Sequence, residues 1–300
     1  MSAKNNQFLP YHLTAIACVI VWGTTFVSTK ILLIHGLTPM WIFFFRFLLA
    51  YLVIWLIPNK RLWADSWRDE GLFFCLGLTG GSIYFLTENT ALQLTLVSNV
   101  ALLVCTAPLL TALLSHWFLK GERLNKPLIY GSLLALLGVA LVVFNGNFIL
   151  KTNPIGDLLS ISAALLWAIY TILMKRLDTR YPVLFITRKV FFYGLLSILP
   201  WLCFSADLPQ LSIVLQPVVV GNLLFLGLLA SMLCYVLWNR TLKVLGTVRT
   251  SNYIYFNPVV TLITSALVLH EKITPIALIG ALLILLGIYW AEKKNYRKRL

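Results

Sequence analysis

The sequence predicts an all-α integral membrane protein in which ten transmembrane helices form two inverted five-helix repeats. Three observations support this fold class. Of the 300 residues, 60% are hydrophobic and only 11% are charged, unlike a soluble domain. Apolar runs of about 18 to 23 residues recur along the chain, and such a run crosses the ~30 Å hydrocarbon core as a helix. The second half of the sequence also repeats features of the first.

The apolar runs are separated by connections too short to hold a soluble domain. The first run is longer than the apolar core of a signal peptide and no A-x-A-like cleavage site follows it, so we expect it to remain as the first span. The short alternating segments of a membrane β-barrel are absent from the sequence. The ten predicted spans are residues 12–34, 39–57, 71–92, 97–119, 128–144, 156–175, 183–204, 217–238, 249–269 and 276–292.

The net charge of +14 follows the predicted topology. With the N-terminus inside, 18 of the 24 Lys and Arg residues fall in cytoplasmic segments, and the opposite side holds only Lys151 and Lys272. The positive-inside rule therefore predicts a multi-pass protein of the cytoplasmic membrane with both termini in the cytoplasm. This placement argues against nucleic acid as a partner. The five cysteines lie in apolar runs without Cys-x-x-Cys spacing, so we expect no disulfide framework, metal or other cofactor.

Two segments, CTAPLLTALLSHWFLKGERL from Cys105 and YFNPVVTLITSALVLHEKIT from Tyr255, carry the same pattern 150 positions apart. We therefore divide the chain into residues 1–150, with the first five spans, and residues 151–300, with the last five. Because five is odd, the second unit enters the membrane from the opposite side, and such inverted repeats permit alternating access. The matched positions include Trp22 with Trp167, Asn89 with Asn239, Pro108 with Pro258, Gly131 with Gly280, and Gly138 with Gly287.

The arrangement of spans, these two segments, the final spans GSLLALLG and GALLILLG, and the stretch YVLWNRTL resemble the EamA-like branch of the drug/metabolite transporter superfamily. The resemblance covers roughly residues 11–292. It implies an inner-membrane secondary carrier, commonly an exporter of amino acids or other small metabolites. The central cavity would lie between the first, third, fourth, sixth, eighth and ninth helices. Glu122 and Glu271 are family markers that we interpret as loop closures.

Apart from Asp157 and Glu292, which lie within two residues of a span end, Glu88 is the one acidic residue inside a predicted span, where an ionisable side chain is costly unless it is paired or hydrated. Arg46 and Lys30 lie at comparable depth, so the three side chains could meet. Two interpretations stay open. Glu88, alone or in an ion pair with Arg46, binds a cationic substrate group or carries a coupling proton; alternatively, it belongs to a static ion pair or reaches the membrane interface.

Aromatic residues near the middle of the spans predict a substrate site. Trp22 and Trp167 lie about ten residues into their spans, and Thr25 and Tyr170 follow three residues later on the same helix faces. Such a wall suits a zwitterion with an apolar side chain, through stacking, cation–π contact and hydrogen bonding. Helix packing is the competing interpretation. The further candidates for substrate binding are Tyr84, Tyr235, Trp238, Asn239 and Tyr253.

Matched prolines and glycines predict moving and packed parts of the helices. Pro108 and Pro258 each remove a backbone hydrogen bond in mid-span and are predicted hinges, with incidental kinks as the alternative. Asn89 is a predicted structural or gating residue, as is its match Asn239. The matched glycines are spaced by seven residues, which allows close contact between the fifth and tenth spans or between protomers. The oligomeric state therefore stays open.

The sequence thus predicts a secondary-active transporter that exports neutral or aromatic amino acids, or similar small metabolites, across the inner membrane by alternating access. Its partners would be a small-molecule substrate and the lipid bilayer. Because no nucleophile motif, paired aspartates or nucleotide-binding Gly-x4-Gly-Lys-Ser/Thr appears, an enzyme is not expected. Two alternatives are a carrier of phosphorylated or nucleotide-sugar-type metabolites, which would require several basic residues at the midplane, and a non-transporting membrane scaffold.

Overall fold

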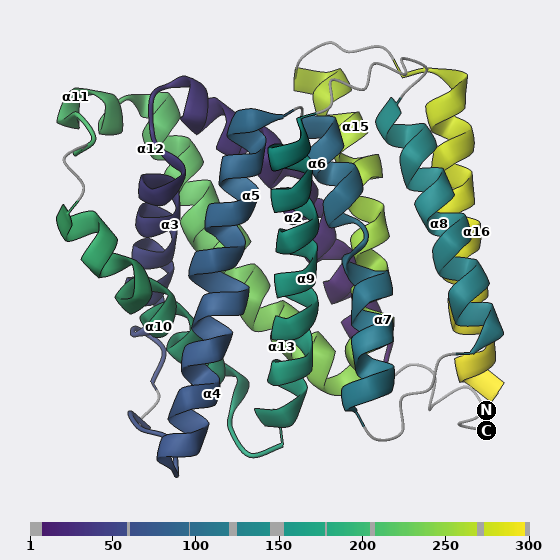
Figure 1. The fold of residues 1–300 in the computed structure, drawn as a ribbon, viewed down its shortest axis with the longest axis horizontal. Coiled ribbons are helices and arrows are strands. Elements are labelled where there is room, and N and C mark those ends of the chain that lie inside the picture. Colours follow the sequence, from purple (N-terminus) through teal and green to yellow (C-terminus); the bar gives the residue numbers. More distant parts are fainter. Residues whose placement is uncertain are drawn as a thin grey trace.

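The fold is built from membrane-length helices. The computed structural model describes residues 8–58, 61–95, 97–119, 125–144, 153–177, 179–204, 208–268 and 273–297. Over these ranges the chain forms helices and no strand (Figure 1). Seven helical stretches of the described chain are long and apolar enough to cross a membrane, and Pro39–Ile54 and Pro275–Ala291 are shorter apolar helices. The all-α multi-pass fold is confirmed, while the count of ten spans stays a prediction.

The helices of the first half begin close to the predicted span boundaries. Prolines occupy the first turn of α2, α3 and α7. Backbone N–H groups in the first turn make no hydrogen bond within the helix, so the absence of this group in proline costs nothing there. The Thr38 hydroxyl accepts a hydrogen bond from the Trp41 N–H and caps α3. In order, the elements are α2 (Leu9–Ile34), α3 (Pro39–Ile54), α4 (Trp67–Gly77), η1 (Leu78–Ser82), α5 (Ile83–Leu94), α6 (Val97–Val104), α7 (Ala107–Phe118) and α8 (Lys126–Phe144).

The second half shows the same succession of long and interrupted helices. Its elements are α9 (Pro154–Leu177), α10 (Val183–Phe204), α11 (Leu211–Val214), α12 (Pro217–Leu224), η2 (Phe225–Leu233), α13 (Cys234–Leu245), α14 (Thr247–Asn252), η3 (Tyr253–Phe256), α15 (Asn257–Val268) and α16 (Pro275–Arg297).

Two long helical stretches are interrupted by π-helical turns at matched positions. The segment η1 lies between α4 and α5, and η2 lies between α12 and α13. Residues 78–82 of η1, moved by the repeat offset of 150, fall on residues 228–232 inside η2. Gly81 has φ −131° and ψ −108°, outside the helical region. Because π-helical turns disturb the backbone hydrogen-bond ladder, they often occur at functional sites.

The predicted breaks at Pro108 and Pro258 appear as changes of helix. The chain leaves α6 through a turn at residues 105–106, and Pro108 is the second residue of α7. Pro258 is likewise the second residue of α15, which follows the 3-10 turn η3. Both prolines therefore begin a new helix within a predicted span. Their role as hinges stays a prediction.

The matched glycines pack α8 against α16, which lie side by side at one edge of the bundle (Figure 1). A Cβ atom added at Gly131 would lie 2.5 Å from the Gly287 carbonyl oxygen. One added at Gly138 would lie 2.5 Å from the Gly280 carbonyl oxygen. Of the two predicted uses for these glycines, the structure supports contact between the fifth and tenth helices.

The start of α4 corrects the expectation that Glu88 is the one acid within a span. The helix begins at Trp67, four residues before the predicted boundary, because the Ser66 side chain caps it by accepting a hydrogen bond from the Asp69 N–H. Asp69 and Glu70 therefore belong to the stretch Trp67–Leu94 and are 4% and 7% exposed.

Asp69 and Glu70 are paired with cations of the second half of the chain. Glu70 accepts from Lys189 Nζ at 2.7 Å and from the Tyr193 hydroxyl. Asp69 accepts from Arg180 Nη1 at 2.8 Å. We call Asp69, Glu70, Arg180 and Lys189 the α4–α10 ion cluster. It joins the two halves at the end of the bundle where α4 and α10 begin (Figure 1).

We predict that Glu70→Gln lowers the free energy of unfolding by about 3–5 kcal/mol, because it leaves the Lys189 ammonium buried without its counter-charge. Chemical unfolding in detergent micelles, followed by tryptophan fluorescence, measures the change. Asp65→Asn is the matched control: it removes an ion pair with Arg61 in which the Asp65 side chain is 68% exposed, so we expect less than about 1 kcal/mol. Equal effects of the two variants would contradict the assignment.

We also predict that Gly138→Ala destabilises the protein by about 1–3 kcal/mol, because the new methyl group would force α8 and α16 apart. The control is Gly221→Ala in α12, where an added Cβ atom meets nothing within 4 Å. That change should be neutral or stabilising by up to about 1 kcal/mol, since alanine favours a helix. The same unfolding assay compares them, and a Gly138→Ala protein as stable as the wild type would show that the helices do not touch at this point.

Candidate functional site

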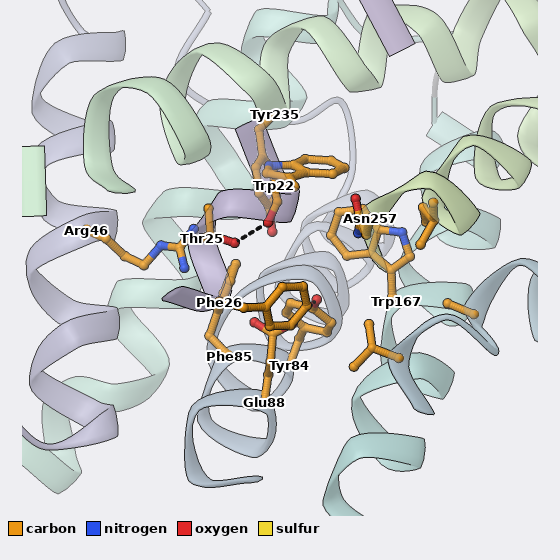
Figure 2. Close-up of a pocket in the computed structure, with 13 residues that line it drawn as sticks. Trp22, Thr25, Phe26, Arg46, Tyr84, Phe85, Glu88, Trp167, Tyr235 and Asn257 are labelled. Carbon is orange, nitrogen blue, oxygen red and sulfur yellow. Dashed lines mark hydrogen bonds between the residues drawn. The ribbon is translucent and has the colours of Figure 1, made fainter. Parts of the chain in front are cut away.

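A cavity lies inside the bundle and receives side chains from both halves of the chain (Figure 2). Its space, opening included, is about 490 Å³. The walls come from α2, α5, α6, α7, α9, α13, η3 and α15, which belong to the helices predicted to form the cavity, and from α3. The lining residues are Trp22, Thr25, Phe26, Arg46, Tyr84, Phe85, Glu88, Val104, Ala107, Trp167, Tyr235, Ile254 and Asn257.

Most of the lining residues occupy matched positions of the two repeats. The pairs are Trp22 with Trp167, Phe85 with Tyr235, Val104 with Ile254, and Ala107 with Asn257. The cavity therefore lies where the two repeats meet. The remaining lining residues, Thr25, Phe26, Arg46, Tyr84 and Glu88, all come from the first repeat.

Two backbone carbonyls of the π-helical turns hold the aromatic wall. Trp22 Nε1 donates to the Ala230 carbonyl in η2 at 2.9 Å, and the Tyr235 hydroxyl donates to the Gly80 carbonyl in η1 at 2.5 Å. Gly80 and Ala230 are matched positions. Each bond crosses from one half of the chain to the other, so the interrupted helices orient the rings that line the cavity.

Trp167 packs edge to face against Trp22 and Tyr235 and at a tilt against Tyr84. The centroids of Trp22 and Trp167 are 5.3 Å apart with their planes at 87°. The ring centroid of Tyr84 lies 5.3 Å from that of Trp167 with the planes at 47°, and that of Tyr235 lies 5.9 Å from it with the planes at 89°. Edge-to-face geometry is the favourable arrangement for aromatic side chains. It leaves a rigid wall that offers ring faces and edges to a bound molecule.

Close approach of α2 and α15 places both helices at the cavity. A Cβ atom at Gly23 would lie 2.6 Å from Cβ of Val260, so only glycine fits there. The Thr261 hydroxyl donates to the Gly23 carbonyl at 2.8 Å. This contact carries Trp22 and Asn257 into the cavity from adjacent helices.

The predicted ion pair between Arg46 and Glu88 is not formed within the described part of the chain. Arg46 Nε instead donates to the Ser231 hydroxyl at 2.9 Å, and the guanidinium lies 4.0 Å from the centre of the Phe85 ring. Glu88 accepts from the Tyr84 hydroxyl at 2.7 Å. Each charge has its own partner, so both remain in the cavity wall with capacity for a further hydrogen bond. Lys30 points elsewhere and donates to the Leu92 carbonyl.

The sequence matches the model of the EamA-like transporter family twice, over residues 9–144 and 154–291. The chain belongs to this family. It is therefore a multi-pass membrane transporter of small molecules rather than an enzyme.

Two curated relatives of this EamA-like transporter match over nearly their whole length. A protein of Archaeoglobus fulgidus described as an uncharacterized transporter is 28% identical and covers 95% of this chain and 98% of its own. A probable amino-acid metabolite efflux pump of Salmonella typhimurium is 30% identical and covers 92% of each chain. A solved crystal structure with 20% identity aligns over 97% of this chain and 99% of its own with a TM-score of 0.75, which shows the same fold.

Several predicted site residues of the transporter lie behind the cavity wall instead of lining it. The Tyr170 hydroxyl donates to Asn239, whose amide donates to the Thr187 hydroxyl, so the three bridge α9, α13 and α10. Trp238 is fully buried with its ring centroid 4.8 Å from that of Trp22. Tyr253 bonds to His12. Asn89 donates to the Pro39 carbonyl and joins α5 to α3.

The sequence interpretation missed six lining residues: Phe26, Phe85, Val104, Ala107, Ile254 and Asn257. The repeat register could have found Phe85, because it is the match of the predicted residue Tyr235. It also relates Val104 to Ile254 and Ala107 to Asn257. Glu122 and Glu271 lie outside the described residues. Among the residues that the structure describes, no group of three or more His, Cys, Asp and Glu side chains could hold a metal ion.

Proposed function

We propose that this transporter is a secondary-active exporter of neutral or aromatic amino acids, or similar zwitterionic metabolites, across the cytoplasmic membrane. One observation carries the proposal: an acidic and a basic side chain, Glu88 and Arg46, line the same aromatic cavity without neutralising each other. A relative described as a probable amino-acid metabolite efflux pump supports this substrate class.

The two charges suit the two ends of an amino acid's backbone. The guanidinium of Arg46 has further N–H groups for the carboxylate, and charge-assisted hydrogen bonds of this kind are strong. The Glu88 carboxylate and the oxygen of the Tyr84 hydroxyl beside it accept hydrogen bonds from the ammonium group. The side chain of the substrate then packs against Trp22, Trp167 and Tyr235. In the empty carrier Glu88 takes up a proton, so substrate and proton exchange at the same carboxylate.

Alternating access would follow from the two repeats, residues 1–150 and 151–300, which we propose to be inverted. From the distribution of basic residues we propose that the α4–α10 ion cluster and both termini lie at the cytoplasmic end. There the cluster fastens the two halves together, and it must separate before the cavity opens on that side. The helix changes at Pro108 and Pro258 are the proposed hinges, and Asn89 is a proposed gating residue.

Phosphorylated substrates fit this cavity less well. Arg46 is the basic residue among its described lining side chains, and Glu88 lines the same space. The other basic candidates in the spans are engaged elsewhere: Lys189 bonds to Glu70, and the Arg188 guanidinium lies 4.5 Å from the Trp55 ring. A phosphate group would instead call for several free basic side chains.

Counterflow of labelled amino acids in proteoliposomes, with and without an imposed pH gradient, tests the proposal. We expect saturable exchange by the wild type. Arg46→Gln should raise the half-saturating concentration roughly tenfold or more, because a hydrogen bond to a charged group contributes about 1.5–3 kcal/mol. Glu88→Gln should lower exchange and remove its dependence on the gradient.

Lys30→Gln is the matched control, because it also removes a cation at a comparable depth in the bundle. The ammonium group of Lys30 donates to the Leu92 carbonyl, outside the cavity. It should retain the wild-type half-saturating concentration. Wild-type kinetics and pH dependence in both cavity variants would refute the roles of Arg46 and Glu88. Exchange of sugar phosphates in place of amino acids would support the alternative carrier, and no exchange of any solute by folded protein would support the scaffold.

A further inference from the structure

Two buried polar groups of the cavity lack a hydrogen-bond partner. Trp167 and Asn257 both line the cavity and are 5% and 6% exposed. Neither Trp167 Nε1 nor Asn257 Oδ1 has a partner within the described part of the chain. Buried polar atoms in proteins are nearly always satisfied, and an exception at a cavity indicates a place for a polar group of a ligand.

These groups lie across the cavity from Arg46. Figure 2 shows Arg46 entering from one side, with Trp167 and Asn257 on the opposite side and Trp22 and Tyr235 between them. The charged groups come from the first repeat, whereas Trp167 and Asn257 come from the second. We call Trp167 and Asn257 the neutral pole of the cavity.

The amide of the neutral pole has no counterpart in the first repeat. The position equivalent to Asn257 in the first repeat is Ala107, which lines the same cavity with a methyl group. The fold therefore accepts a small apolar side chain at this point of the repeat. The backbone oxygen of Asn257 accepts from the Thr261 hydroxyl in α15, while its side-chain amide remains available to a ligand.

The two unpaired atoms require different partners: Trp167 Nε1 needs a hydrogen-bond acceptor and Asn257 Oδ1 needs a donor. The indole N–H of Trp167 is a donor only, so it requires an acceptor. The amide of Asn257 contains an acceptor oxygen and two N–H donors. A hydroxyl or a carboxamide can accept from the indole and donate to the amide at the same time. A methyl, thioether or phenyl group can do neither and leaves both protein groups unpaired.

We infer that the neutral pole selects amino acids whose side chain ends in an uncharged group that both donates and accepts hydrogen bonds. This inference rests on the proposed function and specifies its substrate class. The charged backbone of the substrate binds at Arg46 and Glu88, its body packs on the aromatic wall, and its terminal hydroxyl or carboxamide bonds to Trp167 and Asn257. Apolar amino acids of the same size are then disfavoured because they bury the pole without satisfying it.

Two pairs of labelled substrates test this selectivity in proteoliposome counterflow. Tyrosine and phenylalanine differ by one hydroxyl, and glutamine and methionine have similar length but differ in the carboxamide. The quantity compared is the ratio of exchange efficiencies, maximal rate over half-saturating concentration, within each pair. In the wild type we expect ratios of roughly tenfold or more in favour of tyrosine and glutamine, as in sites that pair a substrate hydroxyl.

Variants of the neutral pole should bring both ratios close to one. Trp167→Phe keeps an aromatic ring and removes the N–H donor. Asn257→Leu keeps the volume and removes the amide, and Asn257→Ala places on α15 the residue that the first repeat carries at the matched position. Thr264→Val, two turns further along α15, is the control, because the Thr264 hydroxyl bonds to the Val260 carbonyl of its own helix. It should keep the wild-type ratios.

The outcomes separate this inference from the proposed function. Equal exchange of both members of each pair by the wild type, or ratios unaffected by the three pole variants, would overturn the selectivity while leaving an amino-acid carrier. Failure of folded wild-type protein to exchange any amino acid would overturn both. Loss of the ratios in the pole variants together with their retention in Thr264→Val supports the inference.

Discussion

The cavity depends on two hydrogen bonds that join the halves of the chain through their π-helical turns. Trp22 donates to the Ala230 carbonyl and Tyr235 donates to the Gly80 carbonyl. Both carbonyls lie in η1 and η2, where π-helical turns replace the regular α-helical hydrogen-bond ladder. The same interruption in both repeats therefore sets the position of the aromatic wall and ties it to both halves.

The buried charges fall into two groups: the α4–α10 ion cluster, which is paired, and Arg46 and Glu88, which line the cavity without pairing with each other. Glu70 and Lys189 are paired directly between α4 and α10, as expected for buried charges in a medium of low dielectric constant. With Pro39 aligned on Pro182, Lys189 falls on the position equivalent to Arg46. Arg46 contacts Ser231 rather than an acid. The cation at this position therefore has a different role in each repeat. Arg46 of the first repeat lines the cavity, whereas Lys189 of the second forms an ion pair between α4 and α10.

Asymmetry within a matched scaffold is what gives the cavity its chemistry. The aromatic and aliphatic lining comes largely in repeat-related pairs, which would by themselves form a nearly symmetric apolar space. Arg46, Tyr84 and Glu88 add charge and hydrogen-bonding capacity from the first repeat, and Asn257 adds an amide from the second where the first has Ala107. A molecule bound here would be oriented by these differences.

The sequence by itself determined the membrane-length helices, the repeat, the family resemblance and most of the aromatic wall, since apolar run length and repeat register are properties of the chain. It also located the helix changes at Pro108 and Pro258. Only the tertiary structure decided that Arg46 and Glu88 stay apart, that Asp69 and Glu70 are buried against α10, and that Asn257 Oδ1 has no hydrogen-bond partner among the described residues. These outcomes depend on contacts between helices that are more than a hundred residues apart in the sequence. Helical periodicity predicts which face of a helix is buried, but it does not predict which other helix packs against that face.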